Sequence, residues 1–335
     1  MRISNLFAIG NLISQVCCNL TYGQTNPPPI TVPARKIFTN DSVKIMVDAS
    51  MRPGSPAGTG GGAGETSSPA ATTQFTAIVT DTDLQPLLIA PPDTMGTVGR
   101  SSVLSMLNQG AMIQSKNGDI VYSTNSLIGF WAHPNIAASN LGTVNNAFDP
   151  RTTYDPFHDR WIATCLVDAT FTNTCGILIG VSLSANPHPT NGWHSLRVAV
   201  DTNQFYWLDQ PTLGFNKDWI VVQGNMQANG VSGVQASYFF VFNKTNLYAR
   251  GTNVVRLFHN DAERAGNERP ALTYDNSLDE LYLIQNADGN YNNVGGRLRL
   301  FSISGAVDDP KLNYLESSNA VYINVANSTS ESGQI

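Results

Sequence analysis

Short apolar runs separated by polar turns recur along the chain from about residue 92 onward. The runs are rich in Val, Ile, Phe, Tyr and Trp and are bounded by Gly, Asn, Asp and Pro, a pattern that predicts β-strands. The clearest group contains four runs, at residues 212–215, 219–224, 237–243 and 254–259. No stretch shows a sustained helical period with capping residues, so we expect little helix.

This four-run group repeats with a spacing of about sixty residues, which is typical of repeat architectures. Pro150, Pro211 and Pro270 each begin a copy, and a weaker copy begins at Pro92. The other predicted strands lie at residues 103–107, 111–114, 119–122 and 127–131, then 152–154, 161–167, 176–183 and 195–200, then 272–274, 281–285, 298–303 and 312–315.

Four short antiparallel strands per repeat, with several repeats in series, predict an all-β fold of the β-propeller class. Four blades are recognisable, a fifth is expected to begin near residues 320–325, and we expect the ring to be incomplete or partly open. One blade cannot bury both of its faces alone, so neighbouring blades must cover them. We therefore expect Tyr154, Phe215 and Tyr274 at matching positions on the innermost strands, and Trp161 and Trp219 between blades.

The composition and the N-terminal sequence favour an exported protein. Charged residues make up 13% of the chain, against roughly 25% of an average soluble domain. Residues 1–23 predict a secretory signal peptide, with an amphipathic leader as the alternative. Residues 24–74 are rich in Pro, Gly and Ser and predict a flexible linker, and residues 75–335 hold the blades. No run is long enough to span a membrane. A net charge of −6 without a basic cluster argues against nucleic acid as a partner.

Secretion bears on the cysteines and on the glycosylation sequons. Cys17 and Cys18 fall in the predicted leader, which leaves Cys165 and Cys175. These two flank a polar link between apolar runs, so we expect a disulfide between adjacent strands, with two buried thiols as the alternative. Sequons that would make the chain a glycoprotein in a suitable host occur at Asn19, Asn40, Asn243 and Asn327.

Three segments carry a resemblance to known proteins. Residues 91–99 read Pro-Pro-Asp-Thr-Met-Gly-Thr-Val-Gly, residues 148–161 contain Phe-Asp-Pro, Tyr-Asp and Arg-Trp, and residues 211–215 read Pro-Thr-Leu-Gly-Phe. Over roughly residues 90–285 the chain resembles a group of secreted, mostly bacterial β-propeller proteins. The resemblance implies a secreted propeller and brings no assigned reaction. The chain departs from the group at Arg100, where proline is commoner, and lacks the blades that normally follow the last repeat.

Acidic residues stand beside the proline of every copy. Asp149 directly precedes Pro150, Asp209 and Glu268 lie two positions before their prolines, and Asp93 follows Pro92. If the first strand of each blade lines the channel, these side chains converge on one rim. A ring of carboxylates at Asp149, Asp209 and Glu268 would hold a hard cation such as Ca²⁺. The alternative is that each acid caps its own turn or pairs with an arginine.

The sequence contains none of the common catalytic motifs, such as G-x-S-x-G, H-E-x-x-H or a Walker loop. We therefore expect a secreted, non-catalytic binding or structural module for an extracellular glycan, protein or surface polymer. The alternative is a channel-sited polysaccharide hydrolase or lyase, in which Asp149, Asp209 and Glu268 do the acid–base work.

Overall fold

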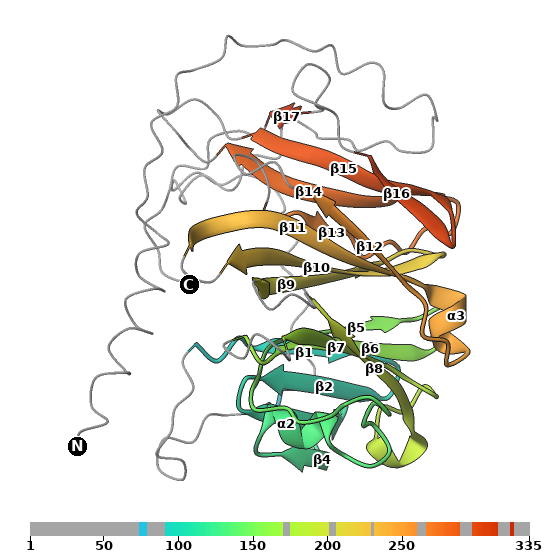
Figure 1. The fold of residues 1–335 in the computed structure, drawn as a ribbon. Coiled ribbons are helices and arrows are strands. Elements are labelled where there is room, and N and C mark those ends of the chain that lie inside the picture. The colour runs from blue at the N-terminus through green and yellow to red at the C-terminus, as the bar shows by residue number, and fades with distance from the viewer. Residues whose placement is uncertain are drawn as a thin grey trace, which may run out of the picture. The chain divides into compact units, whose positions relative to one another are not determined.

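The structure, a computed structural model, describes residues 74–78, 91–169, 175–200, 206–228, 231–259, 266–288, 297–313 and 322–324. All of these residues belong to one compact unit, Glu65–Ile335. Their strands form four antiparallel sheets, each built from consecutive strands in chain order (Figure 1). The predicted all-β fold, a propeller of four-stranded antiparallel blades, is confirmed.

In each blade the first strand in the chain is the innermost, because β1, β5, β9 and β13 contact one another in that order. Blade 1 contains β1 (Met95–Val98), β2 (Ser102–Leu107), β3 (Gly110–Ser115) and β4 (Ile120–Thr124). Blade 2 contains β5 (Ala147–Asp155), β6 (Arg160–Val167), β7 (Gly176–Ser182) and β8 (Trp193–Ala199). Blade 3 contains β9 (Tyr206–Phe215), β10 (Trp219–Ala228), β11 (Val231–Asn243) and β12 (Val254–His259). Blade 4 contains β13 (Arg269–Pro270), β14 (Leu281–Asp288), β15 (Arg297–Ala306) and β16 (Asp309–Asn313).

Three predicted elements are wrong. Residues 127–131 form the helix α2 (Leu127–Trp131), capped by Ser126, and blade 1 takes β1 as its first strand instead. The predicted strand at residues 272–274 contributes an isolated parallel bridge between Leu272 and Phe215. The strand expected to begin a fifth blade, β17 (Tyr322–Asn324), pairs with β15 and extends blade 4.

Apolar side chains join successive blades. One cluster lies between blades 1 and 2 and contains Trp161, a second joins blades 2 and 3, and a third joins blades 3 and 4 through Trp219. Both tryptophans are fully buried, and each ring N–H donates to a backbone carbonyl at 2.8–2.9 Å. The prediction that these two residues pack between blades is therefore confirmed.

Neighbouring blades approach one another closely at two glycines. A Cβ atom at Gly99 would lie 2.4 Å from the Trp161 ring, and one at Gly214 would lie 2.5 Å from Pro270. The matching aromatic positions are only partly as predicted. Phe215 is fully buried, but Tyr274 is 52% exposed because it follows β13 outside the ladder, and its ring packs edge-on against Phe215.

The predicted disulfide is absent: Cys165 and Cys175 are both buried thiols. The register of β6 and β7 places Cys165 opposite Leu178, three residues beyond Cys175. At about 3.3 Å per residue that offset exceeds the reach of a disulfide. The two side chains also face different interfaces, Cys165 toward blade 1 and Cys175 toward blade 3.

Several predictions fall outside the described residues, namely the signal peptide, most of the linker, and the sequons at Asn19, Asn40 and Asn327. The fourth sequon residue, Asn243, caps the helix α3 (Lys244–Tyr248), and its Nδ2 donates to Asp308 at 2.8 Å. None of the helices in the described ranges is long and apolar enough to cross a membrane.

Candidate active site

Every inner strand is preceded or entered by one residue in the left-handed backbone region. These residues are Asp93, Asp149, Gln210 and Asn267, with φ of 46°, 52°, 49° and 62°. Side chains other than glycine seldom adopt this region, and such strain is concentrated at functional sites. The pairing register shifts beside two of them, between Phe148 and Arg151 and between Gln223 and Asn225. These irregularities behave as β-bulges, which change the direction in which a side chain points.

At three blade boundaries the N–H of the left-handed residue donates to a side chain of the preceding blade. Asp149 donates to Asn108 Oδ1 at 2.7 Å, Gln210 to Asp149 Oδ2 at 3.2 Å, and Asn267 to Asn225 Oδ1 at 2.8 Å. These hydrogen bonds link each of the three left-handed residues to the blade before it. The side chains beside these residues form one rim.

Asn108 positions two carboxyl groups at this rim. Its Nδ2 donates to Asp93 Oδ2 at 2.6 Å, while its Oδ1 holds the backbone of Asp149. Asp93 also acts on the Asp149 carboxyl, as a hydrogen-bond partner and through its negative charge.

The environment of Asp149 raises its pKa to about 7. Burial is the largest cause, followed by the hydrogen bond to Asp93 and the negative charges of Asp93 and Asp209; Arg151 has a smaller, opposite effect. Burial also raises the pKa of Asp209, although the N–H of Gln210 favours its ionised form. Two carboxyl groups with raised pKa values at one rim are typical of acid–base chemistry.

Asp149 and Asp209 lie close together because one N–H binds both. The Gln210 N–H contacts Asp209 Oδ1 at 3.0 Å as well as Asp149 Oδ2 at 3.2 Å. These two oxygens are therefore at most about 6 Å apart, which is below the roughly 6.5–9.5 Å carboxyl separation of inverting glycosidases. Asp93, Asp149 and Asp209 are all half-buried, so the rim is accessible to a ligand.

Arg151 supplies positive charge at the same rim. Its Nε donates to the Pro211 carbonyl at 2.7 Å, and an NH group donates to the Pro150 carbonyl at 2.8 Å. Burial lowers its pKa, and the charges of Asp149 and Asp93 act in the opposite direction. Arg151 therefore fixes the first strands of blades 2 and 3 and moderates the negative charge of the carboxyls.

Glu268 does not join this group, in contrast to the sequence prediction. It is fully buried and contacts His259 Nδ1 at 2.8 Å, the Ser237 hydroxyl and the Gly266 N–H. In blade 4 the left-handed residue is Asn267, so Glu268 comes one residue after it, whereas Asp209 comes one residue before the left-handed residue of blade 3. Glu268 therefore stands two positions later than Asp209 relative to that residue, and its carboxyl faces Ser237 and His259.

The prediction for calcium is not supported by a ligand cluster. Among the residues that the structure describes, no group of three or more His, Cys, Asp or Glu side chains is arranged to hold a metal ion. Calcium at the rim stays a prediction from the sequence alone.

Comparison with known proteins gave structural matches only. No family model and no curated protein matches the chain. An exo-β-1,3-galactanase from Phanerochaete chrysosporium, solved with β-1,3-galactotriose, matches at 12% identity and a TM-score of 0.35, covering 67% of this chain and 49% of its own. A GH43 endo-arabinanase from Bacillus licheniformis matches at 14% identity and a TM-score of 0.35, covering 70% of this chain and 80% of its own. An exo-β-1,3-galactanase from Clostridium thermocellum matches at 11% identity and a TM-score of 0.36, covering 72% of this chain and 50% of its own. The chain thus spans about half the length of the galactanases.

The expectation of a non-catalytic module is corrected by these comparisons, because the matched proteins are galactanases and an arabinanase, which are enzymes by name. At such low identities and TM-scores the likeness concerns the fold, and the choice of residues and reaction rests on the geometry of the rim.

Proposed function

We propose that the protein is a glycoside hydrolase that cleaves a polysaccharide at the carboxyl rim of its inner strands. The observation that carries this proposal is the pairing of Asp149 and Asp209 through the Gln210 N–H, with the pKa of Asp149 raised to about 7. Glycosidases need one carboxyl group that is protonated near neutral pH and a second, ionised one close by.

In this reaction Asp149 is the general acid. Its proton passes to the glycosidic oxygen as the bond between that oxygen and the anomeric carbon breaks. The Asp209 carboxylate attacks the anomeric carbon and forms a glycosyl ester, as the short separation favours. Water then displaces Asp209 and gives a proton to the Asp149 carboxylate, which restores both groups.

Asp93 and Asn108 are positioning residues in this account. The Asp93 carboxyl, held by Asn108 Nδ2, keeps the proton on Asp149 by hydrogen bonding and by its charge. The predicted signal peptide would export the protein, and the proposed substrate is therefore a polysaccharide outside the cell.

The test is the release of reducing ends from a panel of purified plant and microbial polysaccharides. Asp149→Asn and Asp209→Asn preserve side-chain shape and should each lower the rate about 100- to 10,000-fold. Glu268→Gln serves as the matched control and should retain activity per folded molecule. The proposal would be contradicted if the wild type and the three variants released reducing ends at equal rates. It would also be contradicted if the protein degraded casein and none of the polysaccharides.

A further inference from the structure

A pocket of about 690 Å³ lies along the inner strands. Its lining runs from Met95 to Arg100 on β1 and the turn after it, continues with Thr152 to Tyr154 on β5 and Pro156 after it, and includes Leu272 and Tyr274 of blade 4. On β5 these residues lie toward the end of the strand, whereas Asp149 lies near its start. The volume is within the usual range for small-molecule sites.

Two threonine hydroxyls in this pocket lack a hydrogen-bond partner. Thr97 is 9% exposed and Thr153 is 5% exposed, and neither hydroxyl binds another described residue. The neighbouring Thr152 differs, since its Oγ1 donates to the Ile162 carbonyl at 3.1 Å. The two side chains are largely buried, but their hydroxyl oxygens are not among the fully buried atoms without a partner and are open to the pocket. They are therefore available to a ligand that can donate and accept hydrogen bonds.

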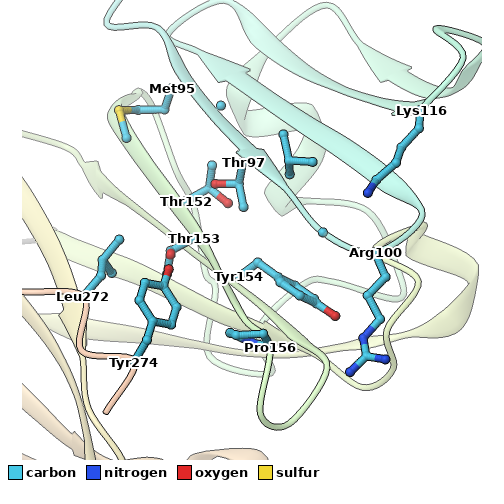
Figure 2. A pocket seen from close by; sticks show the side chains of 13 residues that line it. Met95, Thr97, Arg100, Lys116, Thr152, Thr153, Tyr154, Pro156, Leu272 and Tyr274 are labelled. Atoms are coloured by element: carbon cyan, nitrogen blue, oxygen red, sulfur yellow. The ribbon is translucent and has the colours of Figure 1, made fainter. Parts of the chain in front are cut away.

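The walls around the threonines are apolar and partly exposed. Leu272 is 43% exposed and Tyr274 52% exposed, although both are large apolar side chains. Figure 2 shows the threonines in the middle of the pocket, with Leu272 and Tyr274 at one end and Arg100 and Lys116 at the other. Hydroxyl partners beside an aromatic face match a sugar ring, which has polar edges and apolar C–H faces.

The charge of the pocket favours a neutral ligand. Arg100 Nε pairs with Asp159 at 2.6 Å, and the Tyr154 hydroxyl donates to the same carboxylate at 2.5 Å. Asp159 thus balances the charge of Arg100, and Lys116 is an exposed side chain at the edge.

We infer that this pocket is a second carbohydrate site, which binds one neutral sugar ring along β1 and the later part of β5. The Thr97 and Thr153 hydroxyls bind the ring hydroxyls, and Tyr274 covers a C–H face. The inference uses none of the carboxyl groups, so it stands independently of the proposed hydrolysis.

The test measures binding of glucose, xylose, arabinose, cellobiose and maltose to the full chain by saturation-transfer NMR and thermal shift. At least one sugar should bind. The double variant Thr97→Val/Thr153→Val keeps the branched shape and should weaken that sugar about tenfold or more. Its melting temperature should be unchanged or higher, because valine removes two unpaired hydroxyls.

Two control variants locate the binding. Thr212→Val on β9 removes a paired hydroxyl, which donates to Gln223 at 2.9 Å, and should leave sugar binding unchanged. Asp149→Asn should abolish hydrolysis and leave sugar binding unchanged. The inference is overturned if no sugar binds, if binding survives the double threonine variant, or if binding is lost in Asp149→Asn.

Discussion

The backbone N–H of Gln210 donates to the carboxylate of Asp149 across the boundary between blades 2 and 3, at 3.2 Å. Both residues have left-handed backbone conformations within neighbouring inner strands, Asp149 in β5 and Gln210 in β9. The same N–H also binds Asp209, so two acidic residues about sixty positions apart are held by one donor. The repeat therefore creates the site, because it places equivalent bulges side by side.

The raised pKa of Asp149 predicts how stability changes with pH. Its folded-state pKa of about 7 exceeds the ordinary value of 3.8, so the native state holds this proton more tightly than the unfolded state. The free energy of unfolding should then fall as the pH rises from about 4 to about 7. Asp149→Asn cannot titrate and should show a weaker fall. Thermal melts of both proteins across this range provide the test, and parallel curves would count against the assigned pKa.

Glu268 should be needed for folding and dispensable for chemistry. Glu268→Gln replaces a buried carboxyl that accepts from Ser237 and contacts His259, and we expect a loss of about 1–3 kcal/mol in stability. Urea denaturation would measure this loss, and the activity of the folded fraction should stay near that of the wild type. An unchanged midpoint combined with lost activity would return Glu268 to the catalytic group.

A buried ion pair joins blades 2 and 3 at the other end of β5. Lys244 Nζ lies 3.1 Å from Asp155 Oδ2, and both side chains are almost fully buried. Burial opposes ionisation of Asp155, but Lys244, Tyr248 and His158 outweigh it and lower its pKa. Its contribution to stability is thus present above the ordinary carboxyl pKa and is lost as the pH falls below it.

Asp155→Asn should destabilise the protein by about 3–5 kcal/mol at pH 7, because it leaves Lys244 charged and buried. Asp279→Asn is the matched control, since it breaks the exposed pair with Lys217 and should cost less than about 1 kcal/mol. Chemical denaturation of the two variants compares them directly. Similar losses of unfolding free energy in the two variants would show that the buried Lys244–Asp155 pair stabilises the protein no more than the exposed pair does.

Much of the fold is predictable from strand pattern alone. Blades 2 and 3 contain long β-branched and aromatic runs such as β6, β7 and β10. The predicted bounds of β6 and β7 agree with the structure to within one residue, whereas β10 continues to Ala228, beyond its predicted end at residue 224. The errors fall where the pattern is short. Met95–Val98 has too few apolar residues to stand out as a strand, and five apolar residues at 127–131 fit a helix turn as well as a strand.

The candidate site is predictable only in part, for a reason of register. Proximity to proline treats Asp149, Asp209 and Glu268 alike, but Glu268 follows the left-handed residue of its blade whereas Asp209 precedes it, and the Glu268 carboxyl is buried against Ser237 and His259. The pocket around Thr97 and Thr153 has no sequence signal, since it depends on which faces of three blades meet.

The pH dependence of hydrolysis tests the central claim most directly. If Asp149 is the general acid, the initial rate of reducing-end release should be high at pH 5–6 and fall above its pKa of about 7. A rate that stays constant or rises from pH 6 to pH 9, or that keeps the same profile in Asp149→Asn, would contradict the account.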